Sequence, residues 1–276
     1  MKKELTRRKL IKSLGVLGGA IFTQRYLALG QKESLAGKCR LGQEKLREFA
    51  DHVRSGGPPP DGIPPLSQPK YVPASKASET MGNLLEENSI VFGLNYRGQI
   101  KAYPRSVLVW HEIVNEEIDG QNISVTYCPL TGSAIGFKGK VGKKSTTFGT
   151  SGRLLNSNLV MYDRLSGTES YWPQILSRSI QGTYFGQRLS LIPVIWTSWG
   201  KWKRKYPDSK VLTSDTGYIR SYGNDPYGSY QEEGTYYQQG RPRFGVMAEN
   251  DRFQPKKVVT GVRVKDCTLA VPKEEF

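Results

Sequence analysis

The stretch VTYCPLTGSAIGF, residues 125–137, predicts two β-strands joined by a tight turn. Its β-branched and aromatic residues alternate with polar ones, which favours a pleated surface. Pro129 cannot donate to a strand ladder, and Gly132 lets the chain turn back on itself. Cys128 is therefore expected at the end of the first strand, beside a stiff proline.

The Cys128 thiol has two interpretations. A thiol fixed at a turn could act as a nucleophile, a redox group or a ligand for a soft metal. It could equally be a small buried side chain next to a turn.

Upstream of this stretch, the pattern predicts a hairpin of residues 90–94 and 99–103, followed by a helix that starts at Pro104. A similar pattern recurs 168 residues later, where Val259-x-Gly261 and Ala270-x-Pro272 repeat Val91-x-Gly93 and Ala102-x-Pro104. We expect two equivalent hairpins in one sheet or barrel.

Further strands are predicted at residues 145–149, 159–162, 170–172 and 191–196, with a short helix after Ser198. Residues 217–245 are rich in Tyr, Gly and Pro and predict a long ordered loop. The fold class is therefore α+β and β-rich, with a single mixed or antiparallel sheet or a barrel-like core. The expected domain spans residues 66–276, after a helix and a Pro-rich lead-in over residues 31–65.

The N-terminus resembles a twin-arginine export signal. Arg7-Arg8 precedes two apolar residues, a lysine and a short apolar segment, too short to span a bilayer comfortably. We expect residues 1–30 to be a signal peptide cleaved after Gly30, handled by the twin-arginine export machinery. An uncleaved N-terminal anchor is the alternative. The protein is then periplasmic or extracellular, which makes nucleic acid an improbable partner.

The formal net charge is +15, and removal of residues 1–30, with seven basic residues and one acid, leaves +9. A basic surface suits an anionic lipid, a cell-wall polymer or an acidic substrate, or simply keeps the protein soluble. Three cysteines allow at most one disulfide. We expect Cys39 to pair with Cys267 if a bridge forms, leaving Cys128 free.

Five segments taken together resemble the exported domain-of-unknown-function family 3179 of bacteria and archaea, over about residues 61–272. These segments are WHEIVN (110–115), TYCPLTG (126–132), TSGRL (150–154), SNLVMYDR (157–164) and WPQ (172–174). The resemblance implies no settled activity. Some members carry a second cysteine at the position of Thr131, so this chain departs from a Cys-x-x-Cys redox or metal-thiolate pattern.

Cys128 and His111 are the expected catalytic pair, because an imidazole can stabilise a thiolate. The same two side chains, with Met161 as a third ligand, could hold a soft metal ion such as copper. His111 could instead be a helix residue that bonds to a loop.

The other candidate ligand-binding residues come from the same motifs. The Arg164 guanidinium, beside Asp163, could orient an anionic ligand, or the two could form a buried ion pair. The remaining candidates are Asn115, Thr131, Ser133 and Trp172.

The sequence lacks a phosphate-binding Walker loop, an HExxH zinc motif, a dinucleotide fingerprint and a Gly-x-Ser-x-Gly elbow. Three interpretations stay open. One is an enzyme or redox protein that uses Cys128 and His111 on an unknown small molecule. The second is a binding module that presents Tyr and Trp to an envelope ligand, and the third is a structural envelope protein.

Overall fold

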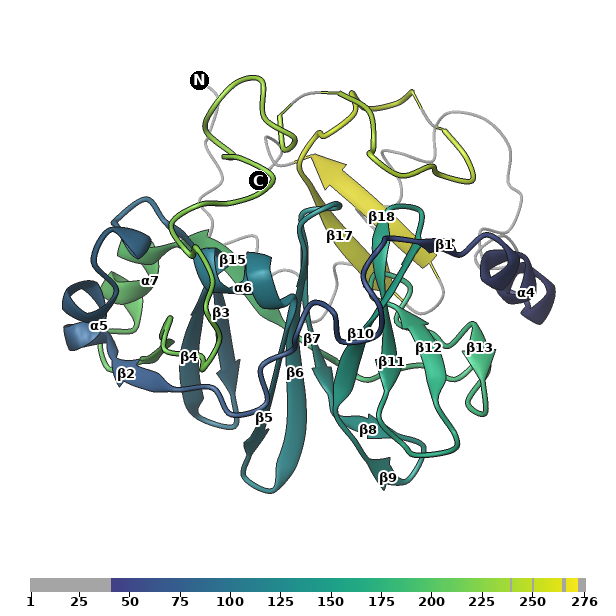
Figure 1. Ribbon diagram of the computed structural model, residues 1–276, viewed down its shortest axis with the longest axis horizontal. Coiled ribbons are helices and arrows are strands. Elements are labelled where there is room, and N and C mark those ends of the chain that lie inside the picture. Colours follow the sequence, from purple (N-terminus) through teal and green to yellow (C-terminus); the bar gives the residue numbers. More distant parts are fainter. Residues whose placement is uncertain (1–40, 239, 250, 265–266, 273–276) are drawn as a thin grey trace, which may run out of the picture. The chain divides into compact units, whose positions relative to one another are not determined.

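The computed structural model describes residues 41–272 except 239, 250 and 265–266. Three sheets follow one another through the unit that contains Leu41–Thr260 (Figure 1). We name them after a central strand: the β3 sheet, the β6 sheet and the β11 sheet. Among the described residues, no helix is long and apolar enough to cross a membrane.

The β3 sheet has the order β15-β3-β4-β16-β2. Its one parallel pair joins β16 to β4, so the sheet is mixed, as expected. Its strands are β2 (Tyr71–Pro73), β3 (Ile90–Tyr96), β4 (Gln99–Pro104), β15 (Val194–Ser198) and β16 (Lys210–Leu212). The helices in the same stretches of chain are α5 (Ala74–Met81), the 3-10 turn η1 (Gly82–Leu84), α6 (Arg105–His111) and α7 (Trp199–Lys205).

The β6 sheet has the order β14-β7-β6-β5 and contains the stretch that opened the sequence analysis. Its strands are β5 (Ile113–Ile118), β6 (Gln121–Cys128), β7 (Ser133–Lys138) and β14 (Leu191–Ile192). Cys128 pairs with Ser133, so the predicted strand, turn and strand are confirmed. Tyr127 packs into the core on the β3-sheet side, whereas Cys128 packs into a second core toward the β11 sheet.

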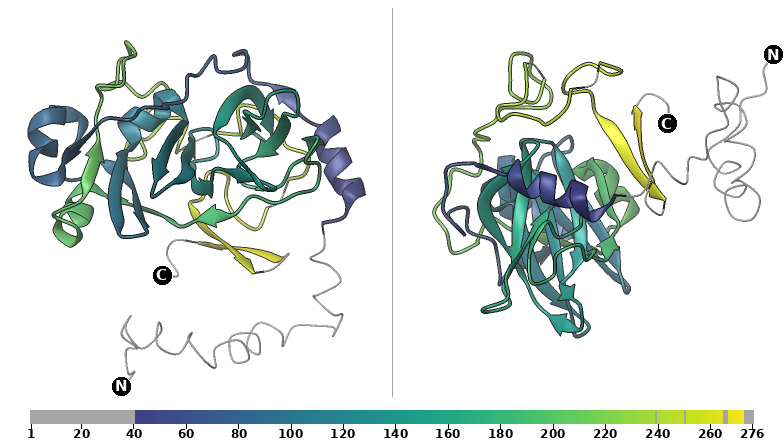
Figure 2. Two further views of the ribbon diagram at one scale, coloured as in Figure 1. Left: turned by 90° about the horizontal axis from the view of Figure 1, so that it is seen from below. Right: turned by 90° about the vertical axis from the view of Figure 1, so that its right-hand side faces the viewer.

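The β11 sheet has the order β1-β10-β11-β12-β13. Its strands are β1 (Arg54–Ser55), β10 (Phe148–Leu155), β11 (Asn158–Asp163), β12 (Ser170–Pro173) and β13 (Gln181–Gly182). A small hairpin, β8 (Lys140–Val141) with β9 (Lys144–Ser145), stands apart from it. Helix α4 (Gln43–Asp51) packs through Leu46 with Leu155, Val160 and Ile180, and lies at one end of the unit (purple helix in Figure 2).

The expectation of one continuous sheet is wrong. Strands β5 and β10 lie side by side, yet no backbone ladder joins the β6 and β11 sheets among the described residues. The Asn115 side chain takes the place of that ladder. Its Nδ2 donates to the Phe148 carbonyl at 2.9 Å, and its Oδ1 accepts from the Phe148 N–H at 3.0 Å. The Asn115 amide bonds the N–H and the C=O of Phe148 as a paired strand would. It therefore joins the two sheets at a place where their strands do not pair.

Both hairpins of the sequence repeat form. β17 (Val259–Val264) and β18 (Cys267–Pro272) match β3 and β4 almost residue for residue. They are nevertheless not in one sheet, because β17 and β18 pair only with each other among the described strands. Residues 261–270 group apart from the unit of Leu41–Thr260. A Cβ on Gly93 would lie 2.0 Å from the Trp202 ring, whereas a Cβ on Gly261 would meet no atom within 4 Å. The packing therefore requires glycine at position 93 but not at position 261.

Candidate functional site

The sulfur of Cys128 lies in the core between the β6 and β11 sheets, and its residue is 1% exposed. It is a free thiol. Its apolar neighbours in this core include Ile113, Leu159, Met161 and Trp172. The side chain of Cys39 and that of Cys267 lie outside the described part of the chain, so their expected disulfide stays a prediction.

Several polar groups point at this sulfur. The backbone N–H of Leu159 donates to Sγ at 3.3 Å, and the thiol lies 3.8 Å from the Ser157 carbonyl oxygen that it can donate to. The backbone and the side chain of Thr131 also lower the pKa of this thiol. Bonds that stabilise the charged form lower a thiol pKa, so Thr131 and Leu159 favour the thiolate. Thr131 thus favours the thiolate from the turn that follows Cys128.

Glu112 is a further residue beside this site, and the sequence did not predict it there. It follows the last residue of α6, where the chain turns into β5, with φ of 57°. Its backbone carbonyl accepts the Tyr127 N–H at 2.7 Å, which fixes Glu112 beside the end of β6. Its residue is 6% exposed, and no described side chain or backbone group bonds to its carboxyl. Burial raises the pKa of Glu112 to about 8.

Glu112 and Cys128 are electrostatically coupled. Burial first, and then the charge of Glu112, raise the pKa of the Cys128 thiol to about 11. Bonds from Thr131 and Leu159 oppose that rise but do not cancel it. Glu112 can accept the thiol proton only in the molecules whose carboxyl is ionised, a fraction that rises as the pH approaches 8, and the two groups titrate as a pair.

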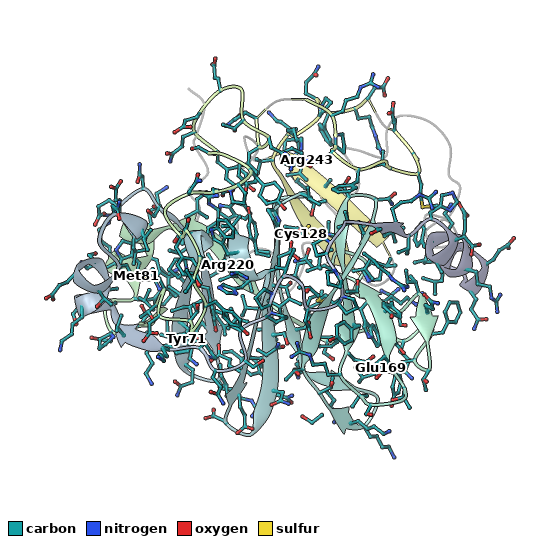
Figure 3. All side chains as sticks on the ribbon, viewed as in Figure 1. Tyr71, Met81, Cys128, Glu169, Arg220 and Arg243 are labelled. Carbon is teal, nitrogen blue, oxygen red and sulfur yellow. The ribbon has the colours of Figure 1, made fainter. Side chains whose placement is uncertain are left out.

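A cavity of about 160 Å³ opens beside this pair. Its wall includes Glu112, with Leu130 and Leu159 from the two chain segments that touch the sulfur. The loop of residues 217–245 closes it with Tyr227, Arg243 and Phe244 (Figure 3 labels Cys128 and Arg243). Two bonds fix this loop over the turn: the Tyr236 hydroxyl donates to the Leu130 carbonyl at 2.9 Å, and Ser157 Oγ donates to the Phe244 carbonyl at 2.5 Å.

The His111 side chain forms no hydrogen bond with Cys128, because its ring nitrogens bond to other residues. Its Nδ1 lies 2.8 Å from the Pro64 carbonyl oxygen, and its Nε2 lies 2.7 Å from the Tyr222 hydroxyl. A carbonyl can only accept, so Nδ1 carries the proton and Nε2 accepts from Tyr222. Burial lowers the pKa of His111, the bond to Pro64 opposes this, and Arg220 lowers it further. The charge that acts on the Cys128 thiol belongs to the next residue, Glu112.

The proposed metal ligands do not converge. Cys128 and Met161 share one core, but both ring nitrogens of His111 are engaged by Pro64 and Tyr222. Within the described ranges, no three side chains of the His, Cys, Asp and Glu types gather as a metal-binding group.

Ser133 belongs to a network of buried amides and hydroxyls at the end of the two sheets. Ser133 Oγ donates to Gln174 Oε1 at 2.6 Å, and Asn158 Nδ2 donates to the same oxygen at 2.9 Å. Asn158 also donates to Thr131 Oγ1 at 2.9 Å. This network holds the Cys128 turn against β11 and β12, so Ser133 positions the site and Asn115 joins the sheets.

Asp163 and Arg164 do not act together. The Asp163 carboxylate points inward and accepts the Trp172 indole N–H at 2.8 Å and the Ser170 N–H at 3.0 Å. Arg164 pairs instead with Asp61 at 2.8 Å. Asp163 and Trp172 therefore stabilise the turn between β11 and β12, and the ion pair ties the Pro-rich lead-in to the β11 sheet.

Comparison with protein families gives a match. The model of a family described as "Protein of unknown function (DUF3179)" matches residues 60–276. No curated protein and no solved structure matches the chain.

Proposed function

The chain belongs to the DUF3179 family of proteins of unknown function, and from that premise we propose that it is an enzyme with Cys128 as nucleophile and Glu112 as proton acceptor. The observation that carries this proposal is the Glu112 carboxyl. Glu112 is buried, no described group bonds to its carboxyl, it lines the smaller cavity, and its charge acts on the Cys128 thiol.

A purely structural role explains Glu112 poorly. A buried polar group without a partner costs folding free energy, and charged groups cost more. Its positive φ adds a backbone cost of about 1–3 kcal/mol for a residue other than glycine. Such features cluster where a reaction needs them.

The reaction begins with the thiol. Sγ of Cys128 forms a bond to an electrophilic carbon of the substrate, and the bond from that carbon to its leaving group breaks. The thiol proton moves to Glu112, which then gives it to the leaving group. Water, deprotonated by the Glu112 carboxylate, attacks the same carbon and frees the sulfur, which takes that proton from Glu112.

p-Nitrophenyl acetate tests this chemistry, because attack by a thiol releases p-nitrophenol and leaves an acetyl group on sulfur. We expect a burst of about one p-nitrophenol per chain and an acetylated Cys128 peptide in the mass spectrum. The chain to use carries Cys39→Ser and Cys267→Ser, so that Cys128 is its one thiol. Acetylation that persists unchanged after Cys128→Ser would overturn the proposal.

A second candidate is a binding module, favoured by the exposed apolar side chains of Tyr218 (44%) and Ile219 (96%) beside Arg220. Exposed apolar side chains that lie together can mark a surface that binds a partner. This alternative predicts an envelope ligand and no burst. In both cases we propose that the protein is exported through its twin-arginine leader.

A further inference from the structure

A second, larger cavity adjoins the one beside Glu112. It has a volume of about 580 Å³, within the range of small-molecule sites. The two cavities share the lining residues Pro58, Gly152 and Arg153. The larger one lies between the end of α4, strand β1, the following proline-rich segment and strand β10.

A β-bulge places Arg153 where the two cavities meet. The pairing of β10 with β11 shifts register between Thr150 and Arg153. Gly152 has φ of 70° there, and a Cβ on it would lie 1.8 Å from the Pro58 carbonyl oxygen. Only glycine therefore allows the proline-rich segment to approach β10 so closely, and the bulge turns Arg153 into the cleft.

The charged groups of the combined cleft are nearly all cationic. Arg54 and Arg153 line the larger cavity, and Arg243 joins Arg153 in the smaller one. No described carboxylate forms an ion pair with these three arginines. Glu112 is the one acidic residue in either lining, and it is largely protonated at neutral pH.

Two of the three guanidinium groups lie over the face of a tyrosine ring. The Cζ of Arg153 lies 4.7 Å from the centroid of the Tyr171 ring, and that of Arg243 lies 5.1 Å from the centroid of the Tyr236 ring. Stacking of this kind leaves the N–H edges of a guanidinium available to bond a planar oxyanion in two places.

We propose that this cleft binds a substrate with a carboxylate or phosphate group, which Arg153 and Arg54 hold in the larger cavity. The electrophilic carbon of the same molecule then enters the smaller cavity toward Cys128. This assignment rests on the proposed thiol chemistry for the second step, but the anion site can be tested without it.

Two alkylating reagents of nearly equal size test the charge preference. Iodoacetate is an anion and iodoacetamide is neutral, and both add a two-carbon group to the Cys128 sulfur with loss of iodide. In the chain with Cys128 as its one thiol, we measure the ratio of the two rates at low salt. Arg153→Gln should lower the iodoacetate-to-iodoacetamide ratio by about fivefold, as expected for loss of one partly screened charge pair.

The matched control is Arg204→Gln, which removes an exposed arginine of α7 that lines neither cavity. It should leave the ratio unchanged. Equal ratios in the parent chain and in Arg153→Gln would overturn the anion site. Failure of both reagents to modify Cys128 would instead count against the thiol chemistry.

A binding measurement tests the anion site even if neither reagent modifies Cys128. Adipate, a dicarboxylate, and inorganic phosphate are titrated by calorimetry into the Cys128→Ser protein, which cannot react. We expect at least one of them to bind, and Arg153→Gln to weaken that binding about tenfold, within the range for charge-assisted hydrogen bonds. Stronger binding of adipate identifies a carboxylate, and stronger binding of phosphate a phosphate ester. Absence of binding by both, or binding unchanged by Arg153→Gln, would refute the anion site.

Discussion

The backbone N–H of Leu159 donates a hydrogen bond to Sγ of Cys128 at 3.3 Å. Because Leu159 belongs to β11 and Cys128 ends β6, this bond joins two sheets at the sulfur atom itself. The sulfur therefore has a fixed position relative to the cavity wall, of which Leu159 is a part. A nucleophile needs such a fixed position more than a core side chain does.

Replacement of Glu112 by Gln should remove a pH dependence from stability. The carboxyl has an ordinary pKa of 4.5, which applies to the unfolded chain, and a pKa of about 8 when folded. Between these values the folded state holds more protons, so stability falls as the pH rises through this window and is fully present below it. The slope is up to ~1.4 kcal/mol per pH unit.

Urea unfolding at several pH values from 4 to 9 measures this slope for the wild type and for Glu112→Gln. We expect the variant to lose most of the decline between pH 5 and 8. Parallel curves for the two proteins would contradict this prediction, because the pKa of Glu112 would then be the same in the folded and unfolded states.

Replacement of Glu112 by Gly should relieve backbone strain. The matched variant is Glu112→Ala, because both remove the carboxyl but only glycine accepts φ of 57° without cost. We expect the Gly variant to be more stable than the Ala variant by about 1 kcal/mol in chemical denaturation. An Ala variant of equal or greater stability would show that the positive φ carries no strain.

The sequence predicts much of this fold because local signals and tertiary packing agree. The strand, turn and strand around Cys128, the helix after Pro104 and the long loop of residues 217–245 all appear where expected. The break between sheets was not predictable, because it depends on the Asn115 amide meeting the Phe148 backbone across the fold.

The same limit applies to the residues of the candidate site. Cys128 and Thr131 follow from one local turn, whereas a partner from another element depends on tertiary structure. His111 and Glu112 are adjacent, and the sequence does not say which of them faces the sulfur. One signal could have indicated Glu112: it is an acid between the apolar residues 107–110 and the apolar start of β5, although a Glu side chain is usually exposed.

Replacement of Asn115 by Ala should destabilise the protein strongly. It removes both bonds to the Phe148 backbone and the acceptor of the Ser124 hydroxyl at 2.6 Å, and leaves buried groups unpaired. We expect a loss of about 2–4 kcal/mol in the free energy of unfolding. The control is Asn95→Ala on β3, an exposed position expected to change stability by less than about 0.5 kcal/mol. Similar values for the two variants would contradict the bridging role of Asn115.

Replacement of Arg7 and Arg8 by Lys should stop export. The variant keeps the charge of the leader but lacks the paired guanidinium groups of the twin-arginine signal. Cell fractionation and N-terminal sequencing should find precursor inside the cell, and a mature wild-type chain that begins at Gln31. A variant exported as well as the wild type would remove the twin-arginine assignment.

The coupling of Glu112 to Cys128 is tested most directly by the rate at which iodoacetamide modifies Cys128 as a function of pH. In the chain with Cys128 as its one thiol, two coupled groups should give two rises in rate, near pH 8 and near pH 11. Glu112→Gln should give a single rise, shifted below pH 11 because the neighbouring negative charge is gone. Identical profiles for the two proteins would contradict the account, because the thiol would then ionise without reference to Glu112.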